Sequence, residues 1–216
     1  MSFSGVIRSS LTRRIAGIVL AIAWLVVLSG CWVESIHALY DDDFMSKDSD
    51  LVFDQRLNGS WTLTDQKCIT VLVISAKDDV YDLQATAHGE GCDDQGKKSK
   101  KIRQHARLVK LDDYYFLDIS PLPHDVCEEC LAKHTIYQLR FDKDSFSMVP
   151  IDSDWLKDAV EKKTVSLSTM PDDTDMLTAS SADLKSFCRK YAADPAVFKP
   201  DSAAVFKRKT ASTAGS

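Results

Sequence analysis

Residues 68–88, with the sequence CITVLVISAKDDVYDLQATAH, decide the fold of this chain. Val80–His88 alternates between apolar side chains at 81, 83, 85 and 87 and polar ones at 82, 84 and 86, as expected for a strand with one buried face. Cys68–Ala76 is apolar on both faces, which predicts a central strand. Lys77-Asp78-Asp79 is typical of a turn, so the two runs predict an antiparallel hairpin.

Further short alternating runs lie on both sides of this hairpin. They are Leu57–Thr64, Arg103–Leu111, Tyr114–Ile119, His134–Phe141 and Phe146–Ile151. Acidic residues at 112–113 and 142–144 separate neighbouring runs and indicate hairpin turns rather than calcium sites, because the D-x-D-x-D-G spacing is missing. Sequential strands joined by tight turns favour an antiparallel meander.

Two helices are expected near the C-terminus. Asp152-Ser153-Asp154 supplies caps for the first, and Ser180 with Asp183 forms a weak capping box for the second. A short strand at 164–168 could lie between them. We therefore predict a mainly β domain with some α structure (α+β): an antiparallel meander of six to eight strands, compatible with a barrel, and one or two C-terminal helices.

Composition supports one ordinary folded domain. The chain has 216 residues, 44% of them hydrophobic, with 27 Lys+Arg and 32 Asp+Glu, and its formal charge is −5. This mixture excludes a wholly disordered or collagenous chain. A net acidic chain is also poorly suited to bind a phosphate backbone, so no nucleic-acid partner is expected.

The first residues have the parts of an export signal. Residues 1–14 hold three arginines and no acid, and Ile15–Leu28 is apolar apart from Gly17. The tetrad Leu28-Ser29-Gly30-Cys31 resembles the lipobox of bacterial lipoproteins at every position. This resemblance implies cleavage between Gly30 and Cys31. It also implies a lipid anchor on Cys31, with acyl chains such as palmitate.

The same resemblance implies a place in the bacterial cell envelope, outside the cytoplasm. Trp32 replaces the Asp that would imply inner-membrane retention, so a Gram-negative cell would hold the protein on its outer membrane, facing the periplasm. An uncleaved signal anchor is the alternative, because Ile15–Val33 is 19 residues without a charge and could span a bilayer. Both interpretations place the domain outside the cytoplasm.

The expected organisation has four parts. Residues 1–30 are the signal peptide, 31–55 a lipid-anchored tether, 56–199 the β-rich domain with its helices, and 200–216 a disordered tail. A basic run from Lys97 to Arg103 lies in the loop before the strand expected at Arg103–Leu111. It is expected to be solvated, with anionic lipid as an alternative partner.

Five cysteines follow Cys31, and disulfides are their default use outside the cytoplasm. The hairpin over 68–88 places residue 68 opposite about residue 88, so a Cys68–Cys92 bridge would join its open end. Other pairings stay open. The disulfide candidates are Cys68, Cys92, Cys127 and Cys130. Cys188 lies on the apolar stripe of the second helix and is expected to be buried and free.

The C-x-x-C motif Cys127-Glu128-Glu129-Cys130 has two sharper interpretations. A thiol–disulfide oxidoreductase is one alternative, although adjacent carboxylates raise rather than lower a thiol pKa. The second alternative is zinc bound by Cys127, Cys130 and His134, with Cys92 or His88 as a fourth ligand. The favoured expectation is structural cysteines and no cofactor.

No G-x-S-x-G, Walker A, G-x-G-x-x-G or H-E-x-x-H motif is present, and four histidines of the mature chain, His88, His105, His124 and His134, are scattered. Gly59-Ser60-Trp61 resembles the G-x-W that opens lipocalins, which implies an eight-stranded barrel around an apolar ligand. The sequence therefore predicts a non-catalytic envelope lipoprotein. Its expected partners are the membrane, through the lipid, and a small apolar ligand or an envelope protein.

Overall fold

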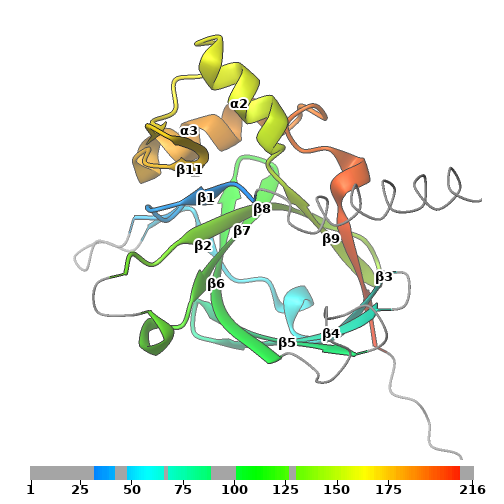
Figure 1. Ribbon diagram of the computed structural model, residues 1–216. Coiled ribbons are helices and arrows are strands. Elements are labelled where there is room, and N and C mark those ends of the chain that lie inside the picture. Colours follow the sequence, from blue (N-terminus) through cyan, green and yellow to red (C-terminus); the bar gives the residue numbers. More distant parts are fainter. Residues whose placement is uncertain (1–31, 42–47, 66–67, 89–100, 127–129, 210–216) are drawn as a thin grey trace, which may run out of the picture. The chain divides into compact units, whose positions relative to one another are not determined.

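The computed structural model describes residues 32–41, 48–65, 68–88, 101–126 and 130–209, and the folded unit begins at Trp32. Eight antiparallel strands close into a barrel (Figure 1). They are β3 (Gly59–Asp65), β4 (Cys68–Lys77), β5 (Val80–His88), β6 (Lys101–Leu111), β7 (Tyr114–Pro121), β8 (His134–Phe141), β9 (Ser145–Pro150) and β12 (Ala204–Arg208). The mainly β fold with a barrel-like meander is therefore confirmed.

Six of these strands run from β3 to β8 in chain order, each paired with its successor. Ile69 pairs with His88, close to the register expected for the β4–β5 hairpin. Asp78 and Asp112 adopt positive φ in their turns, at 58° and 54°. Short polar Asp side chains tolerate this conformation better than β-branched or bulky residues, which explains the turn chemistry.

β12 closes the barrel by pairing with β3 on one side and β9 on the other. The prediction of a disordered tail over 200–216 was thus wrong for its first part, which forms the 3-10 helix η3 (Pro200–Ser202) and β12. Phe206 points into the barrel and is 7% exposed. A five-residue strand is stable here because it gains two partners at once.

The barrel interior is filled by side chains. Its aromatic members are Trp61, Tyr81, Tyr137, Phe146 and Phe206. The Phe146 ring lies 4.7 Å from Trp61 and 5.1 Å from Phe206. Eight strands leave an interior just wide enough for such filling or for one small ligand.

One end of the barrel, here called the closed end, holds Gly59, Arg208 and the hairpin turns after β4, β6 and β8. The 3-10 helix η1 (Gln55–Leu57) precedes β3 and buries Leu57 completely. Trp61 Nε1 donates to the Leu57 carbonyl at 2.9 Å, and the Arg208 guanidinium lies 4.1 Å from the Trp61 ring centre. The opposite end, where β6 and β8 begin, is called the barrel mouth.

A second core covers the outer face of β6 to β9. It is formed by α2 (Ser153–Glu161), α3 (Ser181–Tyr191), β11 (Asp173–Leu177) and the segments around Val33 and Val197. The short strands β1 (Glu34–Ser35) and β10 (Thr169–Met170) both pair with β11 beside this core. Figure 1 shows both helices on one side of the barrel. Asp152 and Ser180 cap the two helices as predicted. The strand expected at 164–168 is not formed; β10 begins at Thr169 instead.

The segment expected to be a tether is part of this folded unit. β1 pairs with β8 and β11, β2 (Leu51–Val52) pairs with β6, and Leu39 is fully buried. These strands have only two residues each, which is too few for an alternation of apolar and polar side chains to be detected in the sequence. The prediction of a linker through residue 55 was therefore wrong for residues 32–41 and 48–55.

β4 was expected to be covered on both faces, and this was wrong for its outer face. Ile69 and Val73 are 46% and 38% exposed there. The helices cover β6 to β9 instead, because the chain reaches them directly after β9. No helix within the described residues is long and apolar enough to cross a membrane.

Candidate functional site

Polar side chains form two rows across the outer face of the barrel. In the first row, His105 of β6 lies opposite Ser120 of β7. His134 begins β8 one position before Thr135, which pairs with Ile119, so it extends the same row beyond Ser120. In the second row, Arg107 lies opposite Asp118. Residues directly opposite on antiparallel strands have Cβ atoms about 5 Å apart, which brings these groups together.

Asp118 and His134 form the most buried polar pair of the site. His134 Nδ1 lies 2.6 Å from Asp118 Oδ1, and Asp118 Oδ2 accepts the Leu39 backbone N–H at 2.6 Å. Asp118 is 1% exposed, while the His134 side chain is 13% exposed. The carboxylate therefore fixes the orientation of the imidazole through Nδ1 and leaves Nε2 as the ring nitrogen that Asp118 does not bind.

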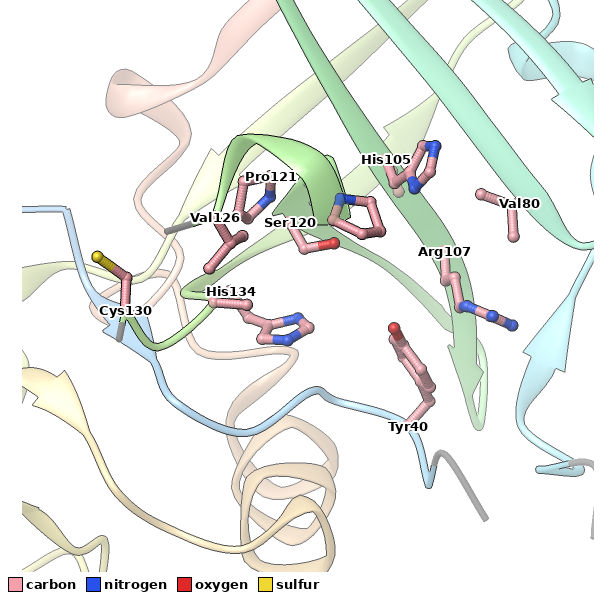
Figure 2. A pocket seen from close by; sticks show the side chains of 12 residues that line it. Tyr40, Val80, His105, Arg107, Ser120, Pro121, Val126, Cys130 and His134 are labelled. Carbon is pink, nitrogen blue, oxygen red and sulfur yellow. The ribbon is translucent and has the colours of Figure 1, made fainter. Parts of the chain in front are cut away.

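A cavity of about 430 Å³ adjoins these rows. Figure 2 shows Ser120, His105, Arg107, His134 and Tyr40 around it, with the Ser120 and Tyr40 hydroxyl groups facing the space between them. Pro121 at the end of β7 and Pro123 and Val126 of the β7–β8 connection form an apolar wall of the cavity. This connection contains the 3-10 helix η2 (Pro123–Asp125). We call this cavity the outer pocket.

The basic groups of the outer pocket have acidic partners. Arg107 donates to Asp79 at 3.0 Å and its guanidinium lies 4.9 Å from the Tyr40 ring centre. His105 Nε2 lies 3.0 Å from Asp82. Because Arg107 and His105 each already contact a carboxylate, the pocket is not an open anion site. It instead offers the Ser120 hydroxyl group, imidazole edges and an apolar wall.

Cys130 also lines the outer pocket. Cys68 and Cys130 are each disulfide-bonded, and the candidate partners Cys92 and Cys127 lie outside the described residues, so the pairing stays a prediction. A disulfide sulfur is a poor zinc ligand because metal binding needs the thiolate. The described residues contain no cluster of three or more His, Cys, Asp or Glu side chains placed to hold a metal.

Of the two remaining cysteines, Cys31 and Cys188, the structure describes only Cys188. Gly30 and Cys31 lie outside the described residues, so cleavage and lipidation stay predictions. Cys188 is fully buried and free, as expected from its place on the apolar stripe. Burial raises the pKa of its thiol, which keeps the group protonated and unreactive.

The grouping of Ser120, Asp118, His105 and His134 was not recognised from the sequence. One signal was available in the sequence. Asp118 interrupts the apolar run Tyr115–Ile119 near the middle of the expected strand. A buried carboxylate without a partner is unstable, so such an Asp points to a nearby donor. Finding His134 as that donor required the β7–β8 register.

No protein-family model matches the chain, and no curated protein or solved structure matches it significantly. The outer pocket must therefore be interpreted from its own geometry.

Proposed function

We propose that the chain is an envelope lipoprotein, anchored at Cys31, whose barrel is a non-catalytic scaffold that binds an envelope protein partner at the outer pocket. The observation that carries this proposal is the contrast between the two faces of the barrel wall. The interior is packed with aromatic side chains, whereas hydrogen-bonding groups gather outside at Ser120, His105 and His134.

The packed interior is the reason to favour a protein over a small apolar ligand. Tyr81 and Phe146 are almost fully buried within the barrel, where a lipocalin-like ligand would have to lie. Displacing such rings would cost the packing of the core. The outer pocket needs no rearrangement to receive a side chain or loop of a partner.

The mixed character of the outer pocket suits a protein segment. Its apolar wall can bury part of a side chain, and the Ser120 hydroxyl and the imidazole groups can pair with a backbone or polar side-chain group. Anchoring would confine the domain to a membrane surface, so even a weak contact with another envelope protein would be populated.

The anchor is tested by the intact mass of the mature protein. We expect a chain that begins at Cys31 and carries acyl groups, and a Cys31→Ser variant that keeps residues 1–30. A wild-type chain that retains residues 1–30 would support the uncleaved signal anchor instead.

The binding site is tested by filling it. Ser120→Trp should occupy the outer pocket and abolish cross-links between the full-length protein and one specific envelope protein. Thr64→Trp, on the exposed outer face of β3, is the matched control and should keep them. Identical cross-linked partners for both variants and the wild type would contradict the proposal.

A second candidate function, ester hydrolysis, is favoured by one observation, the Asp118–His134 pair beside Ser120. That order of carboxylate, imidazole and hydroxyl is the order of a nucleophilic triad. The contacts among the described residues include no hydrogen bond between Ser120 and His134, which is why this candidate ranks second. Ester hydrolysis that Ser120→Ala abolishes, while the fold stays intact, would reverse the ranking. The thiol oxidoreductase and zinc alternatives depend on Cys127 and remain proposals of lower rank.

A further inference from the structure

The folded unit leaves no spacer after the proposed anchor. Trp32 follows Cys31 directly, so their Cα atoms are about 3.8 Å apart. The Trp32 ring already packs on Tyr137, with ring centres 5.5 Å apart, and Val33 is 5% exposed. Whichever surface of the domain carries Trp32 must therefore lie close to the membrane that holds Cys31.

That surface is at the barrel mouth. Glu34 of β1 pairs with Thr135 at the start of β8. Glu34 and Thr135 line a cavity of about 390 Å³ together with Gln104 and Ile119, whose strands begin or end at the mouth. Trp32 lies two residues before Glu34 and contacts Tyr137 from the same side.

Large apolar side chains are exposed at this end of the barrel. Leu131, which lines it, is 69% exposed, Trp32 is 52% exposed, and Ile102 at the start of β6 is 40% exposed. Trp is enriched at membrane–water interfaces, and leucine and isoleucine gain free energy on leaving water. Lys101, Arg103 and Lys133 add exposed cationic groups at the same end, with Lys133 also bonded to Glu34 at 2.7 Å.

The closed end has the opposite character. The antiparallel meander places its alternate turns together, and six carboxylates there, at 78, 79, 112, 113, 142 and 144, outnumber the cationic groups of Lys77, Lys143 and Arg208. An anionic bilayer surface repels such a group of carboxylates. The mouth has acidic groups too, at Glu34 and Asp125 in the cavity and at Asp172 and Asp173 in the β10–β11 turn on the side of Trp32, so apolar contact must supply most of the attachment there.

We infer that the barrel mouth is a second membrane contact. In this arrangement Trp32, Ile102 and Leu131 enter the interfacial layer of the bilayer, and the acidic closed end faces away from it. This inference rests on the proposed anchoring at Cys31. Its consequence is a fixed orientation in which the outer pocket, which shares Pro121, Val126 and Cys130 with the cavity at the mouth, lies next to the membrane surface and faces a partner in the same membrane.

The test uses the full-length lipidated protein in vesicles of phosphatidylcholine with a minor fraction of phosphatidylglycerol, made with or without brominated acyl chains. Leu131→Trp places an indole at the mouth. Tyr114→Trp is the matched control, because Tyr114 is a 37% exposed aromatic residue at the closed end. Ile102→Trp provides an independent position at the mouth. The fluorescence of the unsubstituted protein is subtracted in each case.

We expect brominated lipid to quench the added indole at 131 and at 102 several-fold more than the indole at 114. Equal quenching at both ends, or stronger quenching at 114, would overturn the inference. Flotation of the same vesicles distinguishes a failure of the lipid anchor from a failure of the second membrane contact. Protein that floats without quenching at the mouth refutes only the second contact, whereas protein that fails to float refutes the anchor and the inference together.

Discussion

At the scale of single residues, the Asp118 carboxylate is the polar group whose removal should lower the stability of the fold most. It is 1% exposed and accepts from both His134 and the Leu39 backbone N–H. Asp118→Ala leaves both partners buried without an acceptor, so we expect a loss of about 3 kcal/mol in the free energy of unfolding. Urea unfolding measures it. Asp113→Ala, in an exposed turn, is the control and should change stability by less than about 0.5 kcal/mol.

Gly59 carries a second prediction at this scale. Its φ of 134° lies where side-chain-bearing residues are strained, and a Cβ would come within 2.7 Å of an Arg208 guanidinium nitrogen. That guanidinium donates to the Arg56 and Asn58 carbonyls and covers Trp61. We expect Gly59→Ala to lower stability by about 1–3 kcal/mol and to weaken the near-ultraviolet circular dichroism of the indole. Ser60→Ala should do neither, and an unchanged unfolding midpoint in Gly59→Ala would contradict the closure of this end by Arg208.

At the scale of elements, the segment before β2 is held to α3 by a buried charge cluster. Lys185 lies 2.5 Å from Asp48 and 3.1 Å from Asp50. Burial alone would raise the pKa of Asp48, but Lys185 and the backbone N–H groups of Asp41 and Asp50 outweigh it and hold that pKa below the ordinary value of 3.8. The cluster thus joins the N-terminal part of the folded unit to helix α3, more than 130 residues later in the sequence.

This lowered pKa predicts a pH dependence of stability. Below pH 3.8 the unfolded chain binds the Asp48 proton before the folded one does, so stability is complete above that pH and is lost as the pH falls toward the folded-state pKa. Asp48→Asn should be less stable at neutral pH and lose less stability on acidification. Urea unfolding at stepped pH values measures both effects. Asp113→Asn should keep the wild-type profile, and a wild-type profile in Asp48→Asn would refute the assignment.

At the scale of the whole molecule, closure of the barrel depends on β12. This strand supplies Phe206 to the core and hydrogen bonds to both β3 and β9. A chain ending at Ala203 should expose two sheet edges and part of the core, lose cooperative unfolding and bind a hydrophobic dye. A chain ending at Lys209 keeps every barrel strand and should unfold like the full-length protein. Equal unfolding midpoints for the two truncations would contradict closure by β12.

The alternation of side chains and the acidic turns in the sequence determined the long hairpins, their register to within a residue and the two capped helices. These features depend on contacts between neighbours in the chain, so residues 68–88 alone contain the information for the β4–β5 pair. The acidic Asp78 and Asp112 turns follow from the same local rules. The export signal, the lipobox and the candidate disulfides are also local patterns, and they stay predictions.

Only the tertiary structure decided the closure of the barrel and the composition of the outer pocket. β1 and β2 are too short to show a period, and these two strands and β12 form because edges distant in sequence offer them partners. Asp118, Ser120 and His134 meet because β7 and β8 pair in one register, and a slip of one residue would turn one strand's side chains to the other face. The free energy gained from such long-range pairing depends on the whole fold, so it cannot be recognised in any single segment of this chain.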